Sequence, residues 1–351
     1  MKIGRRRKSL LYFGVATLLV AALIYFTDVQ KFIRNIRSAE KLPLLVGVFF
    51  GLMSFTILGY TWHRFLNKID IDTSYPESFQ LFMSGQFMNS VTPLGQLGGE
   101  PVMAYIVSDT QDTSYEEALS AVMSADIVNT VPFLTFLLGG AAYITLIPSR
   151  SLSSNVLWTV GVAAAITAIG GAITYVLWFR AEILEEKLTS LVRKVVGVTG
   201  RGEKKAEKLE ERFHHLRKTF DSIGEDPHHL ISTAAIAHVF FLFQVAALYS
   251  VISAVGKTPN ISSLYFVVAV ASIANFMPTP GGSGAFEVWM TGVLSQFAGI
   301  TPAKGAAVAV LFRAVTYGTG LVVGYTSLAS LRSSGSSLSI DTIAEQVKSR
   351  K

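Results

Sequence analysis

Long apolar runs separated by short polar segments follow one another along most of the chain. A helix needs about 20 consecutive apolar residues to cross the hydrocarbon core of a bilayer. Six runs approach or exceed that length, and we predict a membrane-spanning helix in each: residues 10–26, 42–66, 116–147, 156–179, 229–255 and 303–331. The pattern predicts an all-α polytopic membrane protein, whose first run is a retained helix and not a signal peptide.

Four shorter helical segments occur as two pairs. Residues 75–89 and 101–107 form the first pair, and residues 262–276 and 285–297 form the second. Each segment is too short to span a bilayer alone. A Gly- and Pro-rich break separates the members of each pair, and such breaks occur at membrane depth only where the backbone is buried or lines a cavity. We therefore predict that each pair forms a re-entrant hairpin or a broken helix.

The two breaks repeat one sequence pattern. Without a gap, Thr92, Pro93, Gly95 and Glu100 match Thr279, Pro280, Gly282 and Glu287. A broken, acid-bearing segment that occurs twice in hydrophobic surroundings is typical of transporters built from two inverted halves. We predict an inverted-repeat helical bundle in which the two hairpins meet near the membrane midplane.

The distribution of basic residues predicts the orientation. Lys and Arg favour cytoplasmic segments, and most of them fall in residues 1–8, 180–229 and 333–351. We therefore expect a multi-pass plasma-membrane protein with cytoplasmic N- and C-termini, and a basic stretch at 31–41 outside. The transmembrane domain covers residues 1–332, with a cytoplasmic insertion at 180–229 that contains an amphipathic helix at 203–223. Residues 333–351 form a cytoplasmic tail.

Composition narrows the possible chemistry. The chain is 50% hydrophobic and 15% charged, against about 25% charged residues in soluble domains. It has no cysteine, which excludes disulfides, thiolate metal sites and cysteine nucleophiles. The net charge of +6 fits contact with anionic lipid and not nucleic-acid binding. We predict no cofactor and no metal, because the His pairs at 214–215 and 228–229 lack the spacing to acidic residues that metal sites use.

Away from the ends of the predicted membrane segments, the charged residues are Glu100, Asp126, Glu287 and Arg313. Asp126 follows Glu100 by 26 residues, and Arg313 follows Glu287 by the same 26. Charges at membrane depth cost several kcal/mol and usually face a partner or a wet cavity. We predict that the four line one central cavity, where Arg313 neutralises at least one carboxylate. A structural ion pair that only fixes helix packing is the alternative.

The residues of the two breaks complete the predicted substrate site. Glycine permits positive φ and close backbone approach, so exposed N–H groups at a hairpin tip would attract an anion such as a lipid phosphate. The alternative is that these glycines only permit tight helix packing. The substrate-binding candidates are Asn89, Thr92, Pro93, Gly95, Gly98, Gly99, Glu100, Asp126, Asn275, Pro278, Pro280, Gly281, Gly282, Gly284, Glu287 and Arg313. Within this set, the two Asn residues are expected mainly to cap the freed backbone.

The same residues carry a resemblance to a known family. Residues 89–100, followed by a helix and then by Pro278-Thr279-Pro280-Gly281-Gly282-x-Gly284-x-x-Glu287, resemble the UPF0104 or flippase-like family. This family is the transmembrane region of lysylphosphatidylglycerol synthases, and the resemblance covers roughly residues 10–330. It implies movement of an aminoacylated phospholipid or a polyprenyl-phosphate-linked sugar between leaflets. One position departs from the family pattern, because Ala125-Asp126 stands where an acid-Arg pair is frequent.

Three functions are compatible with these patterns. The leading hypothesis is a lipid flippase or transporter and not an enzyme, since we expect no soluble aminoacyl-transferase domain on this chain. The second is a membrane-embedded lipid-headgroup transferase that uses a carboxylate as base. The third is a non-catalytic partner whose 203–223 helix recruits a cytoplasmic lipid-modifying or glycosyl-transfer enzyme. Membrane lipids are the expected partners in all three.

Overall fold

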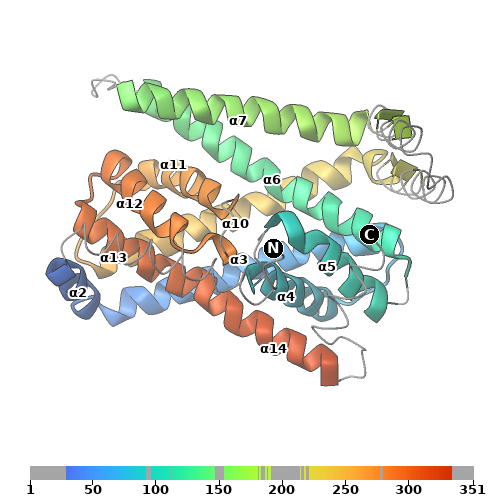
Figure 1. The fold of residues 1–351 in the computed structure, drawn as a ribbon, viewed down its shortest axis with the longest axis horizontal. Helices are drawn as coiled ribbons and strands as arrows, with labels where there is room; N and C mark the ends of the chain where they lie inside the picture. Colours follow the sequence, from blue (N-terminus) through green and yellow to red (C-terminus); the bar gives the residue numbers. More distant parts are fainter. Residues whose placement is uncertain are drawn as a thin grey trace, which may run out of the picture.

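The described part of the chain is entirely helical. The computed structural model describes residues 29–91, 96–111, 113–146, 154–180, 221–276 and 280–333, with isolated residues between 182 and 218. Every regular element in these residues is a helix, which confirms the predicted all-α class (Figure 1). Four of the described helices are long and apolar enough to cross a membrane: Lys41–Lys68, Tyr115–Tyr143, Pro227–Ala254 and Pro302–Leu331. The predicted helix at 10–26, most of the amphipathic helix at 203–223 and the tail at 334–351 lie outside the described residues.

The first half of the bundle contains α3 (Lys41–Lys68), α4 (Tyr75–Val91), α5 (Gln96–Thr110) and α6 (Tyr115–Leu146). The starts of α4 and α6 follow from one local motif. Glu77 accepts from the backbone N–H of Ser74 at 2.8 Å, and Glu117 accepts from that of Ser114 at 3.2 Å. The Ser114 hydroxyl accepts in return from the N–H of Glu117 at 3.2 Å, which completes a capping box. These polar caps determine where the two helices begin.

The second half contains α10 (Pro227–Ala254), α11 (Ile261–Ser272), α12 (Ala285–Phe297), α13 (Pro302–Arg313) and α14 (Thr319–Ser333). Two short 3₁₀ turns, η1 (Ile273–Phe276) and η2 (Pro280–Gly282), lie between α11 and α12. A single π-helical turn, η3 (Ala314–Gly318), separates α13 from α14. The membrane-spanning helix predicted at 303–331 is confirmed, since Pro302–Leu331 forms one span that contains this turn. The turn is a π-bulge, a feature frequent at functional sites.

Two further helices flank this core. The helix α7 (Ser154–Phe179) packs on α6 and exposes Trp158, which is 76% accessible, so this face suits contact with lipid. The helix α2 (Val29–Arg37) was not predicted, since the basic stretch was treated as a connection. Its Phe32 is buried against Ala306 and Ala307 of α13. Apolar positions 29, 32, 33 and 36 have helical spacing and would have revealed it.

The two halves meet along α3 and α10, which run antiparallel. The N–H of Glu40, before α3, donates to Ala254 O at the end of α10 over 2.9 Å. At the opposite end, Lys68 forms an ion pair with Asp226 at 2.8 Å. Between these ends, Gln244 Nε2 donates to Ser54 Oγ at 2.9 Å. The ends and the middle of both helices are therefore in register.

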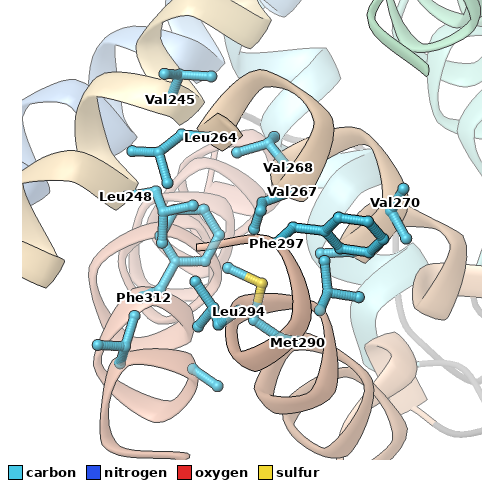
Figure 2. Packing of buried hydrophobic residues seen from close by; sticks show 14 of the residues in the cluster. Val245, Leu248, Leu264, Val267, Val268, Val270, Met290, Leu294, Phe297 and Phe312 are labelled. Atoms are coloured by element: carbon cyan, nitrogen blue, oxygen red, sulfur yellow. The ribbon is translucent and has the colours of Figure 1, made fainter. Parts of the chain in front are cut away.

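One of the shorter helices of each half also packs against the last helix of the other half. The helix α4 lies against α14, and α11 lies against α6 (Figure 1). The core of the second half gathers side chains from α10 to α13, including Leu248, Val267, Met290, Leu294 and Phe312 (Figure 2). In a bilayer such interfaces depend on close van der Waals packing, because lipid tails are as apolar as the side chains. This packing holds the segment between α11 and α12 in place.

Gly51 is the point of closest approach between α3 and the π-helical turn. A Cβ atom at this position would lie 2.4 Å from Val315 O. We expect Gly51→Ala to lower the free energy of unfolding in mixed detergent micelles by about 1–3 kcal/mol, the usual range for overpacking. Gly47→Ala is the matched control one turn away, where the nearest atom would lie at 3.4 Å. Equal unfolding free energies of the two variants would contradict the role given to Gly51.

Candidate functional site

A buried ion pair lies where α13 ends and the π-helical turn begins. Arg313 Nε is 3.5 Å from Glu287 Oε1, and both side chains are 9% exposed. Arg313 was predicted to neutralise at least one membrane-embedded carboxylate, and the geometry identifies Glu287 as that carboxylate. A pair this deeply buried is costly to desolvate and needs further hydrogen bonds to be stable.

The guanidinium group of Arg313 obtains those further contacts from the second break. Its Nη2 donates to Gly281 O at 2.6 Å and to Ser283 Oγ at 3.1 Å. Its Cζ lies 4.8 Å from the ring centroid of Phe286 and 4.1 Å from that of Tyr317, both within cation–π range. Arg313 therefore connects the tip of the second break to the end of α13, the helix that carries this arginine.

The conformation of the second break depends on its glycines. Gly281, Gly282 and Gly284 have φ values of 56°, 72° and 82°, which L side chains rarely adopt. The chain thereby turns the carbonyl of Gly281 toward Arg313 and begins α12 at Ala285. Glu287 then accepts from the N–H of Gly284 at 2.7 Å, so its carboxylate caps α12 as well as pairing with Arg313. Pro278 and the side chains of Asn275 and Pro280 lie outside the described residues.

Of the first break, the structure describes only the part that begins α5 (Gln96–Thr110). The helix α5 begins at Gln96 and not at the predicted Pro101, so Gly98 and Gly99 lie inside a helix. The prediction of a glycine tip was wrong for these two residues, because helical hydrogen bonding extends across them and across Pro101. Thr92, Pro93 and Gly95 lie outside the described residues. Asn89 is buried in the last turn of α4.

The carboxylates of Glu100 and Asp126 form a second charged group. Asp126 lies close enough to Glu100 for their like charges to interact, and it also lies beside the indole of Trp62. Among the described residues, no Lys or Arg forms an ion pair with either acid. The four predicted charges therefore divide into two acids in the first half and an acid–base pair in the second. That all four line one cavity stays a prediction.

Tyr317 connects the second break to the first half. Its hydroxyl donates to Ser90 O, near the end of α4, at 3.1 Å. The turn η2 contacts α4, and the turn η1 contacts α5. Sequence reasoning missed Tyr317, Ser283 and Phe286. The position of Tyr317, one helical turn after Arg313, was the only available signal for an aromatic partner of the guanidinium.

No metal site is evident in the part of the chain that the structure describes, where no three His, Asp or Glu side chains are grouped to hold an ion.

The sequence pattern of the family described as "Lysylphosphatidylglycerol synthase TM region" matches residues 10–324. The chain belongs to this family. The predicted resemblance is confirmed, and it includes both breaks and all four membrane-embedded charges.

Relatives of this protein share nearly its whole length. A UPF0104 membrane protein of Methanothermobacter thermautotrophicus is 23% identical over 349 residues, covering 96% of this chain and 100% of the relative. A UPF0104 membrane protein of Methanocaldococcus jannaschii is 21% identical and covers 92% of this chain and 94% of the relative. One from Pyrococcus horikoshii is 22% identical, with 90% and 95% covered. These similarities establish a multi-pass membrane protein.

Proposed function

We propose that this protein moves a lipid with a charged headgroup between the two leaflets of the plasma membrane. The substrate class is an anionic or aminoacylated phospholipid, or a polyprenyl-phosphate-linked sugar. The buried Glu287–Arg313 pair at the tip of a broken helix carries the proposal. Ionisable residues inside membrane segments are costly and mark substrate or ion pathways. Membership of a family named for a lipid-modifying synthase supports the same substrate class.

The arrangement of the two halves supports an inverted repeat. The antiparallel contact of α3 with α10 and the reciprocal packing of α4 on α14 and α11 on α6 are what a two-fold axis in the membrane plane would produce. In transporters of this kind, broken segments from both halves meet at the substrate site near the midplane. We propose that α4–α5 and α11–α12 are those segments, entering as re-entrant hairpins from opposite sides. Both termini would then be cytoplasmic.

The two charged groups would hold different parts of a headgroup. A phosphate would compete with Glu287 for Arg313 and would accept from Ser283 and from backbone N–H groups near Gly282 and Gly284. An ammonium group would lie between Glu100 and Asp126, where two like charges favour a cation. An aminoacylated phospholipid carries both groups. The other predicted candidates would line the same route: Asn89, Thr92, Pro93, Gly95, Gly98, Gly99, Asn275, Pro278, Pro280 and Gly281.

Leaflet translocation in proteoliposomes tests this function. We would reconstitute the protein with labelled lysylphosphatidylglycerol, phosphatidylglycerol and a polyprenyl-phosphate sugar in parallel. Selective movement of one lipid is expected, and Glu100→Gln and Glu287→Gln should each slow it by about tenfold or more, because each removes one membrane-embedded charge that would contact the headgroup.

The matched control is Glu225→Gln, which removes an exposed carboxylate just before α10. It should leave translocation unchanged. If folded protein in sealed vesicles moves none of the three lipids, or if the Glu100 and Glu287 variants match the wild type, the proposal is wrong. Headgroup transfer would then be tested by product formation in detergent, which needs no second compartment.

A further inference from the structure

A polar groove lies at the end of the bundle where α3 ends and α10 begins. Its volume is about 550 Å³, and its lining includes Tyr60, His63, Arg64, Lys68, Asp72 and His229. It contains none of the residues that form the Glu287–Arg313 and Glu100–Asp126 groups. The groove therefore needs its own explanation.

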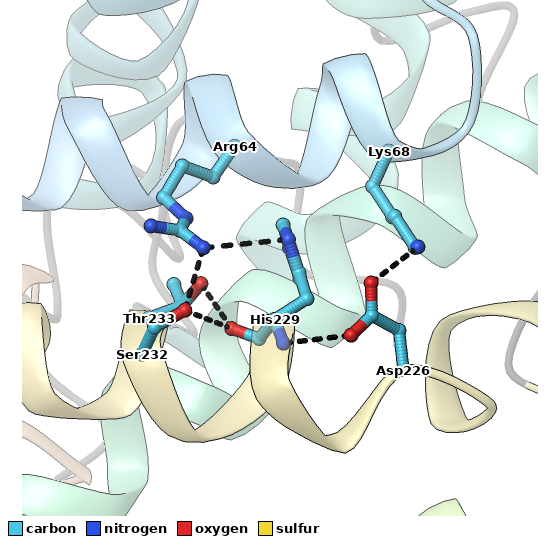
Figure 3. A network of polar contacts seen from close by, with 6 residues as sticks. All are labelled: Arg64, Lys68, Asp226, His229, Ser232 and Thr233. Carbon is cyan, nitrogen blue, oxygen red and sulfur yellow. Dashed lines mark hydrogen bonds and ion pairs between the residues drawn. The ribbon is translucent and has the colours of Figure 1, made fainter.

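Arg64 is a cation of the groove that has no acidic partner among the described residues. Its Nη2 donates to Ser232 Oγ at 2.7 Å and lies 3.5 Å from His229 Nδ1 (Figure 3). Its Nε is buried without a hydrogen-bond partner, and no carboxylate within the described ranges forms an ion pair with the guanidinium. A buried N–H of a charged group that lacks an acceptor is costly. An anion in the groove would remove that cost.

The second cation, Lys68, already has a partner on its far side. Its Nζ is 2.8 Å from Asp226 Oδ2, and Asp226 also accepts from the N–H of His229 at 2.9 Å (Figure 3). The Lys68 hydrogen bond and then the His229 N–H hold the pKa of Asp226 down, to about 2. Asp226 is therefore charged at neutral pH and keeps Lys68 beside the groove. Asp72, in contrast, is exposed on the rim.

The groove lies at the ends of two helices that are long and apolar enough to span a bilayer, Lys41–Lys68 and Pro227–Ala254. Tyr60, which lines the groove, is the last exposed large apolar residue of α3 and is 39% accessible. The ring of Tyr60 lies 5.9 Å from that of Tyr75 and 6.0 Å from that of His63. Tyrosine side chains concentrate at the boundary between acyl chains and headgroups. A lipid lying along α3 would bring its phosphate to Arg64.

We infer that this groove binds a phosphate group through Arg64, assisted by Lys68. The ligand is a phosphate monoester or diester, carried by a membrane phospholipid or by a soluble molecule. Guanidinium groups suit this role because their fixed N–H fork matches phosphate oxygens. This site goes beyond the proposed function, since binding here requires no movement between leaflets.

Binding of the purified, full-length protein in detergent tests the inference. Native mass spectrometry would measure binding of phosphatidic acid, with diacylglycerol as the matched lipid without phosphate, and thermal shift would measure inorganic phosphate and glycerol 3-phosphate. Phosphatidic acid is expected to bind, and Arg64→Gln should weaken it about tenfold or more, as the loss of a charge-assisted hydrogen bond predicts. Arg64→Lys should recover part of the affinity. Binding of the soluble phosphates as well would identify a soluble source of ligand.

Three variants separate anion binding from helix packing. Ser232→Ala removes a hydrogen bond of Arg64 without removing its charge and should change phosphatidic acid binding less than about threefold. Asp72→Asn removes a negative charge from the rim and should leave binding equal or stronger. Lys257→Gln removes a charge from the opposite end of α10 and should have no effect. The inference is overturned if Arg64→Gln binds phosphatidic acid like the wild type, or if Ser232→Ala loses as much affinity as Arg64→Gln.

Discussion

Replacing Arg313 with Gln is expected to lower the free energy of unfolding by about 3–5 kcal/mol, the range measured when one partner of a buried ion pair is removed. The change leaves Glu287 buried and without its counter-ion. It also removes the donors to Gly281 O and Ser283 Oγ, so the tip of the second break loses its connection to α13. Unfolding in mixed detergent micelles, followed by tryptophan fluorescence, measures the effect.

Two further variants show whether the pair itself is responsible. Glu287→Gln should cost less, because Arg313 keeps Gly281, Ser283 and the rings of Phe286 and Tyr317 as partners. The double variant Glu287→Gln/Arg313→Gln should be more stable than Arg313→Gln alone, since no uncompensated charge stays buried. Additive losses in the double variant would show that the pair contributes no coupling.

Gly281→Ala is expected to be the second most damaging change, at about 2–5 kcal/mol. An L residue at φ 56° costs about 1–2 kcal/mol, and overpacking adds about 1–3 kcal/mol. A Cβ here would lie 2.2 Å from Tyr317 Oη, the atom that bonds to Ser90 O. The variant should therefore disturb the contact between the halves as well as the break itself. The same unfolding measurement in mixed detergent micelles checks it.

Gly299 provides the matched control for backbone strain. It has a φ of 65°, but nothing lies within 4 Å of the position that a Cβ atom would occupy there. Gly299→Ala should therefore lose only the conformational part, about 1–2 kcal/mol. The difference between the two variants measures the steric contact with Tyr317. Equal losses at both glycines would show that this contact is unimportant.

Helices that depend on local sequence were predictable. Apolar runs place α3 and α10 within two residues of their predicted bounds, and α12 matches its prediction at both ends. The length of an apolar run is a property of consecutive residues, so it can be read without knowledge of the fold. The short amphipathic α2 was not predicted, because its basic residues were taken to be a connection between helices although its apolar residues have helical spacing.

The candidate site was predictable only in part. The rarity of charge in apolar runs identified Glu100, Asp126, Glu287 and Arg313. It did not show that Arg313 pairs with Glu287, or that Glu100 and Asp126 lie close to each other. The repeated pattern also did not show which of its glycines are helical. Gly98 and Gly99 lie inside α5, whereas Gly281 and Gly282 have positive φ. Which backbone conformation a glycine adopts depends on what packs against it.

The sequence by itself determined the all-helical membrane class, the family, the two breaks and the residues that carry charge at membrane depth, because each follows from short-range pattern and composition. Only the tertiary structure decided which of these residues meet. Arg313 reaches Gly281 across 32 residues of sequence, Tyr317 reaches Ser90 across 227, and Arg64 reaches Ser232 across 168. Those contacts depend on how closely the helices pack. Small residues such as Gly51 permit the close approach, and the local sequence pattern does not show which glycines do so.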